Sequence, residues 1–102
     1  AVTGTTRSAA RPDVPTSAEA GLPAFEAVQY YGLTAPAGVP RPIVDRLNKE
    51  LRTMLTAEDF KKRLIEAGDD PAPSTPEEYA ANIKREEGKW AELIKKLGLK
   101  VE

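Results

Sequence analysis

One stretch of eighteen residues, FEAVQYYGLTAPAGVPRP at positions 25–42, most constrains what this chain can fold into. Its first nine residues alternate loosely between two faces, as a β-strand does, and only Glu26 and Gln29 interrupt their apolar character. Because so few polar residues occur, we expect other parts of a fold to cover both faces of this strand. The prolines and the glycine of APAGVPRP then exclude any regular continuation. The stretch therefore predicts a strand that turns through a rigid corner.

Three helices are predicted after this corner, at about 42–55, 56–68 and 75–97. The first carries a single apolar stripe, so Leu47 and Leu51 are expected to lie in a core. The third has signals at both ends, because Thr75 is a favourable N-cap and Gly98 a favourable C-cap. Its apolar stripe is interrupted around Gly88, which predicts one packing contact near each end of the helix.

Residues 1–24 are predicted to form a loop and one short helix. Residues 1–4 could be the end of a second strand. Thr16 and Glu19 have the spacing of a capping box, and Gly21 would end the single turn in a left-handed conformation. A hydroxyl-rich helix start can also bind an anion, although Glu19 itself already supplies the capping charge.

Two sets of charged residues have two interpretations each. Arg7 and Arg11 are either solvated loop residues or a means of recognising a carboxylate, because arginine presents a planar fork of donors. Asp69 and Asp70 could form a metal or acid–base site. Adjacent acids in a turn are more commonly solvated, so the structural interpretation is favoured for both sets.

The composition excludes several classes of function. Cysteine and histidine are both absent, which removes thiol catalysis, disulfides, thiolate or imidazole metal ligands and a Ser-His triad. A net charge of −1 gives no reason to expect nucleic acid or an anionic membrane as a partner. No apolar run is long enough to span a membrane. We therefore expect no catalytic residue, no metal site and no cofactor.

Several motifs together resemble the receptor proteins of tripartite tricarboxylate transporters, also called Bug proteins. These motifs are AVTG at the start, PDVPT followed by EAG, then YYGL, TAPAGVPRP and the tail from RLIEAGDD to LGLK. The resemblance covers essentially the whole chain. Tyr30 departs from it, because the family usually has tryptophan at that position.

The resemblance implies an α/β fold of the periplasmic-binding-protein type (type II), in which two lobes close on a small carboxylate. Such receptors are about three times as long, so the chain resembles their C-terminal third. It would form a single partial domain over residues 1–102, helix-rich with one or two strands. Residues 25–40 would be the strand that crosses between the lobes and its corner, and residues 41–102 the three helices. The implied location is periplasmic, with the membrane subunits of the transporter as partners.

The resemblance also suggests where a ligand binds. In such receptors the carboxylate is held mostly by backbone amides and ordered water, and much of that site is expected to precede Ala1. The candidates within this chain are Thr5, in the loop after AVTG, and the neighbouring Tyr30 and Tyr31. A tyrosine can donate its hydroxyl to a carboxylate while its ring forms a wall of the pocket. Both tyrosines can equally be half-buried packing residues.

Two other classes of function remain open. The chain could be a helical module that binds a protein partner through its apolar stripes, without any ligand. It could also be an enzyme, since one fold supports many functions, but no nucleophile–base pair is present. Uncovered apolar faces further predict a homo-oligomer, formed by strand pairing or by exchange of the C-terminal helix about residues 71–74. Of these two routes, the sequence favours helix exchange.

Overall fold

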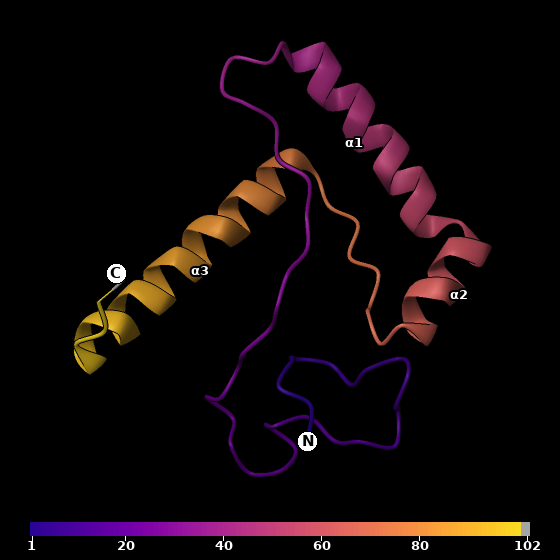
Figure 1. Ribbon diagram of the computed structural model, residues 1–102. Coiled ribbons are helices and arrows are strands. Elements are labelled where there is room, and N and C mark those ends of the chain that lie inside the picture. The colour runs from indigo at the N-terminus through magenta and orange to yellow at the C-terminus, as the bar shows by residue number, and fades with distance from the viewer. Residues whose placement is uncertain (101–102) are drawn as a thin grey trace.

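A computed structural model describes residues 1–100 and shows three helices that follow a long non-helical segment (Figure 1). The helices are α1 (Arg41–Thr56), α2 (Glu58–Glu66) and α3 (Pro76–Leu97). Their positions agree with the periodicity of the sequence to within about two residues. Ala57 alone separates α1 from α2, and the beginning of α3 lies against α1. No helix in the described part of the chain is long and apolar enough to cross a membrane.

Local signals set both ends of α3. The hydroxyl of Thr75 accepts a hydrogen bond from the amide of Glu78 at 3.1 Å, and the Glu78 carboxylate accepts one from the amide of Thr75 at 2.9 Å. This is a complete capping box, with Pro76 at the first helical position. At the other end Gly98 has φ 64°, the left-handed conformation that ends many helices. The predicted caps of this helix are confirmed.

The N-terminal loop is closed by hydrogen bonds between its two ends. Val2 and Thr16 form an isolated parallel bridge, and the amide of Ser17 donates to the carbonyl of Val2 at 2.8 Å. The predicted capping box is present, because Thr16 and Glu19 exchange hydrogen bonds of 2.8 and 3.2 Å. Gly21 has φ 99°, as expected. The box opens a hydrogen-bonded turn and not the predicted short helix. The amides of Ala20, Gly21 and Leu22 donate to the carbonyls of Thr16, Ala18 and Ser17, and so short a segment does not offset the cost of fixing a helical nucleus.

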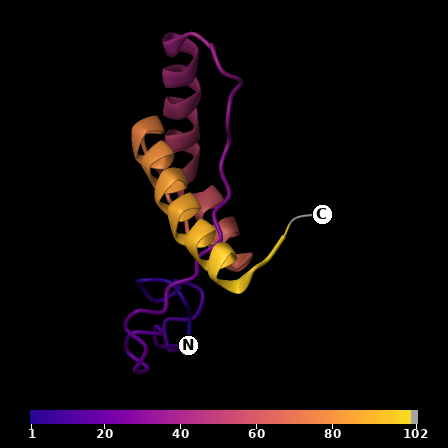
Figure 2. The same ribbon diagram turned by 90° about the vertical axis from the view of Figure 1, so that its left-hand side faces the viewer.

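The strand predicted for residues 25–33 is not confirmed. This segment runs past α3 and beside α1 (Figures 1 and 2), but it pairs with no other strand within residues 1–100. Two hydrogen bonds at Ala27 join the segment to the start of the N-terminal loop. The Ala27 amide donates to the carbonyl of Thr3 at 3.0 Å, and the Ala27 carbonyl accepts from the Thr3 hydroxyl at 2.6 Å. A strand needs a neighbour to complete its ladder, and the described chain supplies none. The second strand considered for residues 1–4 is likewise reduced to an isolated bridge between Val2 and Thr16.

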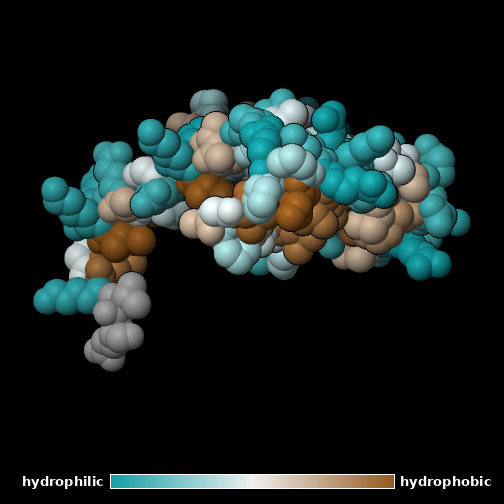
Figure 3. All heavy atoms as spheres, turned by 90° about the horizontal axis from the view of Figure 1, so that it is seen from above, coloured by the Kyte–Doolittle hydropathy of each residue, from teal (hydrophilic) through white to brown (hydrophobic). Residues whose placement is uncertain are grey.

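No apolar side chain of residues 1–100 is buried, and the expected core is therefore absent. Leu47 is 53% exposed and Leu51 is half-buried, so their predicted core positions are wrong for this chain. The buried side chains are those of Thr16 and Ser17, in the N-terminal loop. Apolar side chains instead lie at the surface among charged ones, as Figure 3 shows.

The open architecture is visible in the dimensions of the molecule. Its accessible surface is 8419 Å², whereas a compact monomer of this mass would expose about 5,700 Å². The radius of gyration is 16.5 Å, against about 13 Å for a compact domain of this length. The helices are thus well formed, while their apolar faces are uncovered.

Candidate functional site

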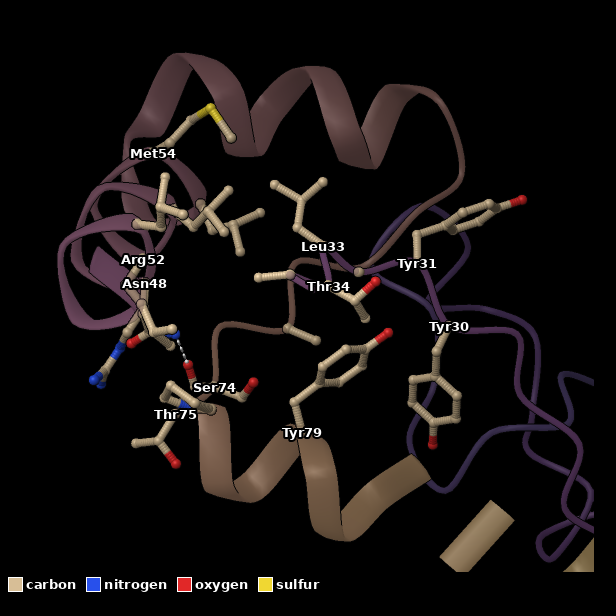
Figure 4. Close-up of a pocket in the computed structure, with 18 residues that line it drawn as sticks. Tyr30, Tyr31, Leu33, Thr34, Asn48, Arg52, Met54, Ser74, Thr75 and Tyr79 are labelled. Carbon is tan, nitrogen blue, oxygen red and sulfur yellow. Dashed lines mark hydrogen bonds between the residues drawn. The ribbon is translucent and has the colours of Figure 1, made fainter. Parts of the chain in front are cut away.

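A groove with a volume of about 470 Å³ lies between α1, the start of α3 and residues 30–35 (Figure 4). Its walls are mostly aliphatic, and six of the side chains that form them are Leu33, Val44, Leu47, Leu51, Met54 and Leu55. Five of these belong to the apolar face of α1, which periodicity assigned to a core. The structure places this face around an open groove.

Tyr30 and Tyr31 both line the groove, but their side chains point in different directions (Figure 4). Tyr30 is 40% exposed and turns towards α3, where it also borders a second hollow beside Trp90. Tyr31 is 78% exposed and turns away from the groove, and its hydroxyl accepts a hydrogen bond from Gln29 Nε2 at 3.0 Å. The two hydroxyls therefore do not converge on one point.

Thr5 lies elsewhere, in the exposed N-terminal loop, and does not line this groove. The structure thus brings together two of the three candidate ligand-binding residues. Their role in binding stays a prediction.

Tyr79 is a groove residue that the sequence analysis did not single out. Its ring and hydroxyl lie so close to Gly32 that a side chain at Gly32 would overlap them. This contact fixes the segment that carries Tyr30 and Tyr31 against the first turns of α3. The available signal was Gly32 itself, because a glycine among bulky strand residues often marks a close approach.

The groove offers few polar groups. Asn48 uses its side-chain amide to bind the carbonyl of Ser74 at 2.8 Å, and the hydroxyl of Thr75 is occupied as the α3 N-cap. Arg52 also lines the groove, but its guanidinium points outwards (Figure 4). Such a lining suits an aliphatic group better than a carboxylate, which needs several donors.

The two arginines considered for carboxylate recognition are engaged within their own loop. Arg7 Nε lies 2.9 Å from the Glu19 carboxylate, and its Nη1 donates to the carbonyl of Pro12 at 3.0 Å. Arg11 forms an ion pair of 2.9 Å with Asp13. Hydrogen bonding from Arg7 is the main reason that the pKa of Glu19 is lowered to about 2. These contacts favour the structural interpretation of both arginines.

Asp70 also has a structural contact. Its Oδ1 accepts a hydrogen bond from the amide of Ala9 at 3.2 Å, which links the turn after α2 to the N-terminal loop. Within residues 1–100 no cluster of three or more acidic side chains could hold a metal ion.

Comparison with known proteins gives consistent relationships. A family model described as "Tripartite tricarboxylate transporter family receptor" matches residues 1–99. The "UPF0065 protein in tcbD-tcbE intergenic region" of Pseudomonas sp. (strain P51) is 42% identical over 94 residues, which cover 91% of this chain and 28% of that protein. "Protein BugT" of Bordetella pertussis is 30% identical over 101 residues, covering 99% of this chain and 31% of its own length. No solved structure matches the chain.

A further relative, from Agrobacterium vitis, is 34% identical over 101 residues, 96% of this chain and 29% of that protein. The chain thus spans about three tenths of the length of the curated relatives it matches. The family match includes the motifs from AVTG onwards that carried the resemblance and ends within the last of them, at Leu99. The chain belongs to the receptor family of tripartite tricarboxylate transporters.

Proposed function

We propose that this chain is part of a periplasmic receptor that binds a small carboxylate and delivers it to the membrane subunits of a tripartite transporter. The observation that carries the proposal is the family match over residues 1–99. Capture and delivery of a solute require reversible contacts and no covalent step, so no catalytic residue is part of the proposal.

In this proposal the hydroxyls of Tyr30, Tyr31 and Thr5 contribute donors to a site that is completed by further chain. Tyr30 and Tyr31 are exposed and lie on one segment, which Tyr79 holds against α3. A receptor of the relatives' length has about three times as much chain to form a second wall. The same additional chain would cover the apolar face of α1 that is open here.

The proposal can be tested with a chimera of the Pseudomonas relative. The region of that protein aligned with this chain is replaced by this chain, and the melting temperature is measured with citrate, succinate and related carboxylates. At least one carboxylate should raise the melting temperature by several degrees, since a ligand that binds only the folded state stabilises it. Tyr30→Phe and Tyr31→Phe should each reduce that shift, because they remove a donor and keep the ring.

Two controls make the result decisive. The unaltered relative shows which carboxylates the receptor framework accepts, and succinamide tests whether the carboxylate charge is needed. A chimera that unfolds cooperatively, yet does not respond to a carboxylate that stabilises the unaltered relative, would contradict the proposal.

A second candidate is a helical module that binds a protein partner without any ligand. The observation that favours it is the exposure of the apolar residues of α3, among them Ile83 at 45% and Leu97 at 61%. The chimera also separates the two functions, because a binding module gives no reason for a response to small carboxylates.

A further inference from the structure

The segment that carries Tyr30 and Tyr31 is held on α3 at two points, one near each of its ends. At Gly32 the ring of Tyr79 occupies the place of a side chain. At Glu26 the main-chain carbonyl accepts a hydrogen bond from the ammonium group of Lys89. We call Tyr79 and Lys89 the two anchors of residues 26–32.

The Lys89 anchor is itself kept in place by its neighbours on α3. Its Nζ lies 5.2 Å from the centroid of the Trp90 ring, within the range of a cation–π interaction. The Trp90 ring is fixed in turn, because its Nε1 donates a hydrogen bond of 2.9 Å to the Glu86 carboxylate. The Glu86 side chain is only 16% exposed. Lys89 is therefore directed at the Glu26 carbonyl by a supported ring and does not extend freely into solvent.

The spacing of the anchors matches the length of the segment. Tyr79 and Lys89 are separated by about 15 Å along a helix that rises 1.5 Å per residue. Glu26 and Gly32 are separated by at most about 20 Å in an extended chain. The long side chains of the anchors can span the difference. The segment thus runs antiparallel to α3 and is held from both ends.

The Tyr79 anchor is also fixed relative to α1. Asn48 of α1 donates a hydrogen bond of 2.8 Å to the carbonyl of Ser74, just before α3. Arg41 of α1 forms an ion pair with Glu77 in the first turn of α3. These contacts fix the start of α3 on α1, so the position of the segment is defined relative to both helices.

This attachment decides which way the two tyrosines face. Neighbouring side chains of an extended chain point to opposite sides. Figure 4 shows Tyr30 turned towards α3 and Tyr31 turned away from it, where Tyr31 is 78% exposed. A shift of the segment by one residue would exchange the two directions. Anchors at both ends oppose such a shift.

We propose that Tyr79 and Lys89 are positioning residues of the receptor, which hold residues 26–32 so that Tyr30 stays on α3 and Tyr31 faces away from it. The inference rests on the proposed function, because it takes the two tyrosines as ligand donors. A donor that is held before the ligand arrives does not have to be ordered on binding, so the anchors should raise the affinity. The anchors would also oppose exchange of α3 between copies, the route to an oligomer that the sequence favoured.

The first test measures the dissociation constant of the chimera described above for a carboxylate that stabilises it. Tyr79→Leu removes the atoms that lie beside Gly32 and should raise the dissociation constant by about tenfold. Tyr79→Phe keeps the ring and should restore most of this loss. Lys89→Met removes the donor and should raise the dissociation constant by about threefold, and Lys89→Arg should restore most of that loss. The matched control is Lys84→Met, at an exposed lysine of the same helix, which should change nothing.

A coupling measurement separates positioning from a general effect on stability. Tyr31→Phe should weaken binding in the unaltered chimera and have much less effect in the Tyr79→Leu background, because a hydroxyl that is no longer held contributes little. A variant that only destabilised the fold would leave the effect of Tyr31→Phe unchanged. Equal effects of Tyr31→Phe in the two backgrounds would overturn the inference.

The mobility of the two tyrosines supplies a readout that needs no ligand. The chimera is labelled with ¹⁵N-tyrosine, and the amide signals of Tyr30 and Tyr31 are assigned from their phenylalanine variants. Their order parameters should be about 0.85 in the unaltered chimera and fall below about 0.6 when both anchors are replaced.

The outcomes distinguish this inference from the proposed function. Tyrosines that become mobile without the anchors, in a chimera that responds to no carboxylate accepted by the unaltered relative, would contradict the proposed function and support the anchoring. Tyrosines that stay rigid without both anchors would overturn this inference, whether or not the chimera binds a carboxylate.

Discussion

The hydroxyl of Tyr79 lies where it would overlap a β-carbon at Gly32, so that no side chain fits at that glycine. Gly32 does not have a positive φ, and its lack of a side chain is therefore required for space and not for backbone conformation. This contact joins α3 to the segment that bears Tyr30 and Tyr31. It couples the position of the two candidate binding residues to the position of a helix.

We expect Gly32→Ala to lower the free energy of unfolding by about 1–3 kcal/mol, because the added methyl group must displace the ring of Tyr79. The matched control is Gly88→Ala in α3, where an added methyl group meets nothing within 4 Å. There the same substitution should raise the free energy of unfolding by about 0.5–1 kcal/mol. Urea denaturation followed by circular dichroism, at equal chain concentrations, measures both changes.

The contact itself can be isolated with Tyr79→Leu. In that background Gly32→Ala should cost much less, because the ring that it displaces is gone. An equal loss in both backgrounds would show that Tyr79 does not occupy the space beside Gly32.

A second prediction concerns Glu19. Hydrogen bonding from Arg7, and then from the amide of Thr16, lowers the pKa of Glu19 from 4.5 to about 2 in the folded loop. Because the folded-state pKa is the lower one, the contribution to stability is fully present above about pH 4.5 and is lost as the pH falls towards 2. Carboxyl chemical shifts in an NMR titration should give a midpoint near 2 for Glu19.

Arg7→Ala should move that midpoint back towards 4.5, since it removes the largest cause of the shift. Arg46→Ala, which removes the exposed ion pair with Glu50 on α1, is the control and should leave it unchanged. A midpoint near 4.5 in the unaltered chain would mean that the Arg7–Glu19 pair does not persist in solution.

A third prediction concerns Leu47. Leu47 belongs to the apolar stripe of α1. If it were fully buried, Leu47→Ala would lower the free energy of unfolding by about 2–5 kcal/mol. In the structure it is 53% exposed, and we therefore expect a loss below about 1 kcal/mol in urea denaturation. A larger loss would show that something in solution covers this face of α1.

The helices were predictable because their signals are local. Thr75, Pro76 and Glu78 lie within four residues, and together they set the beginning of α3 without help from the rest of the chain. Gly98 ends the same helix through its own φ angle. The capping box of Thr16 and Glu19 was predictable for the same reason.

The strand and the core were not predictable, because both depend on neighbours. The sequence of residues 25–33 suits a strand, but pairing needs a second strand, and the described residues provide none. The stripe of Leu47 and Leu51 likewise needs an opposing surface before it becomes a core. The contact of Tyr79 with Gly32 joins residues far apart in sequence and leaves only the glycine as a signal.

The last prediction is that this chain alone does not bind citrate or succinate with micromolar affinity. The groove beside Tyr30 is mostly aliphatic, and Tyr31 directs its hydroxyl away from it. Arg7 and Arg11, the two arginines considered for recognition, are already paired with Glu19 and Asp13.

Isothermal titration calorimetry measures this directly, with the chimera as the positive control. A binding site encloses most of its ligand, and one open wall leaves the carboxylates in water, where they keep their hydration. Heat should therefore appear with the chimera and not with the chain. A stoichiometric micromolar response from the chain alone would mean that it already encloses the carboxylate, and that the further wall assumed in the proposed function is unnecessary.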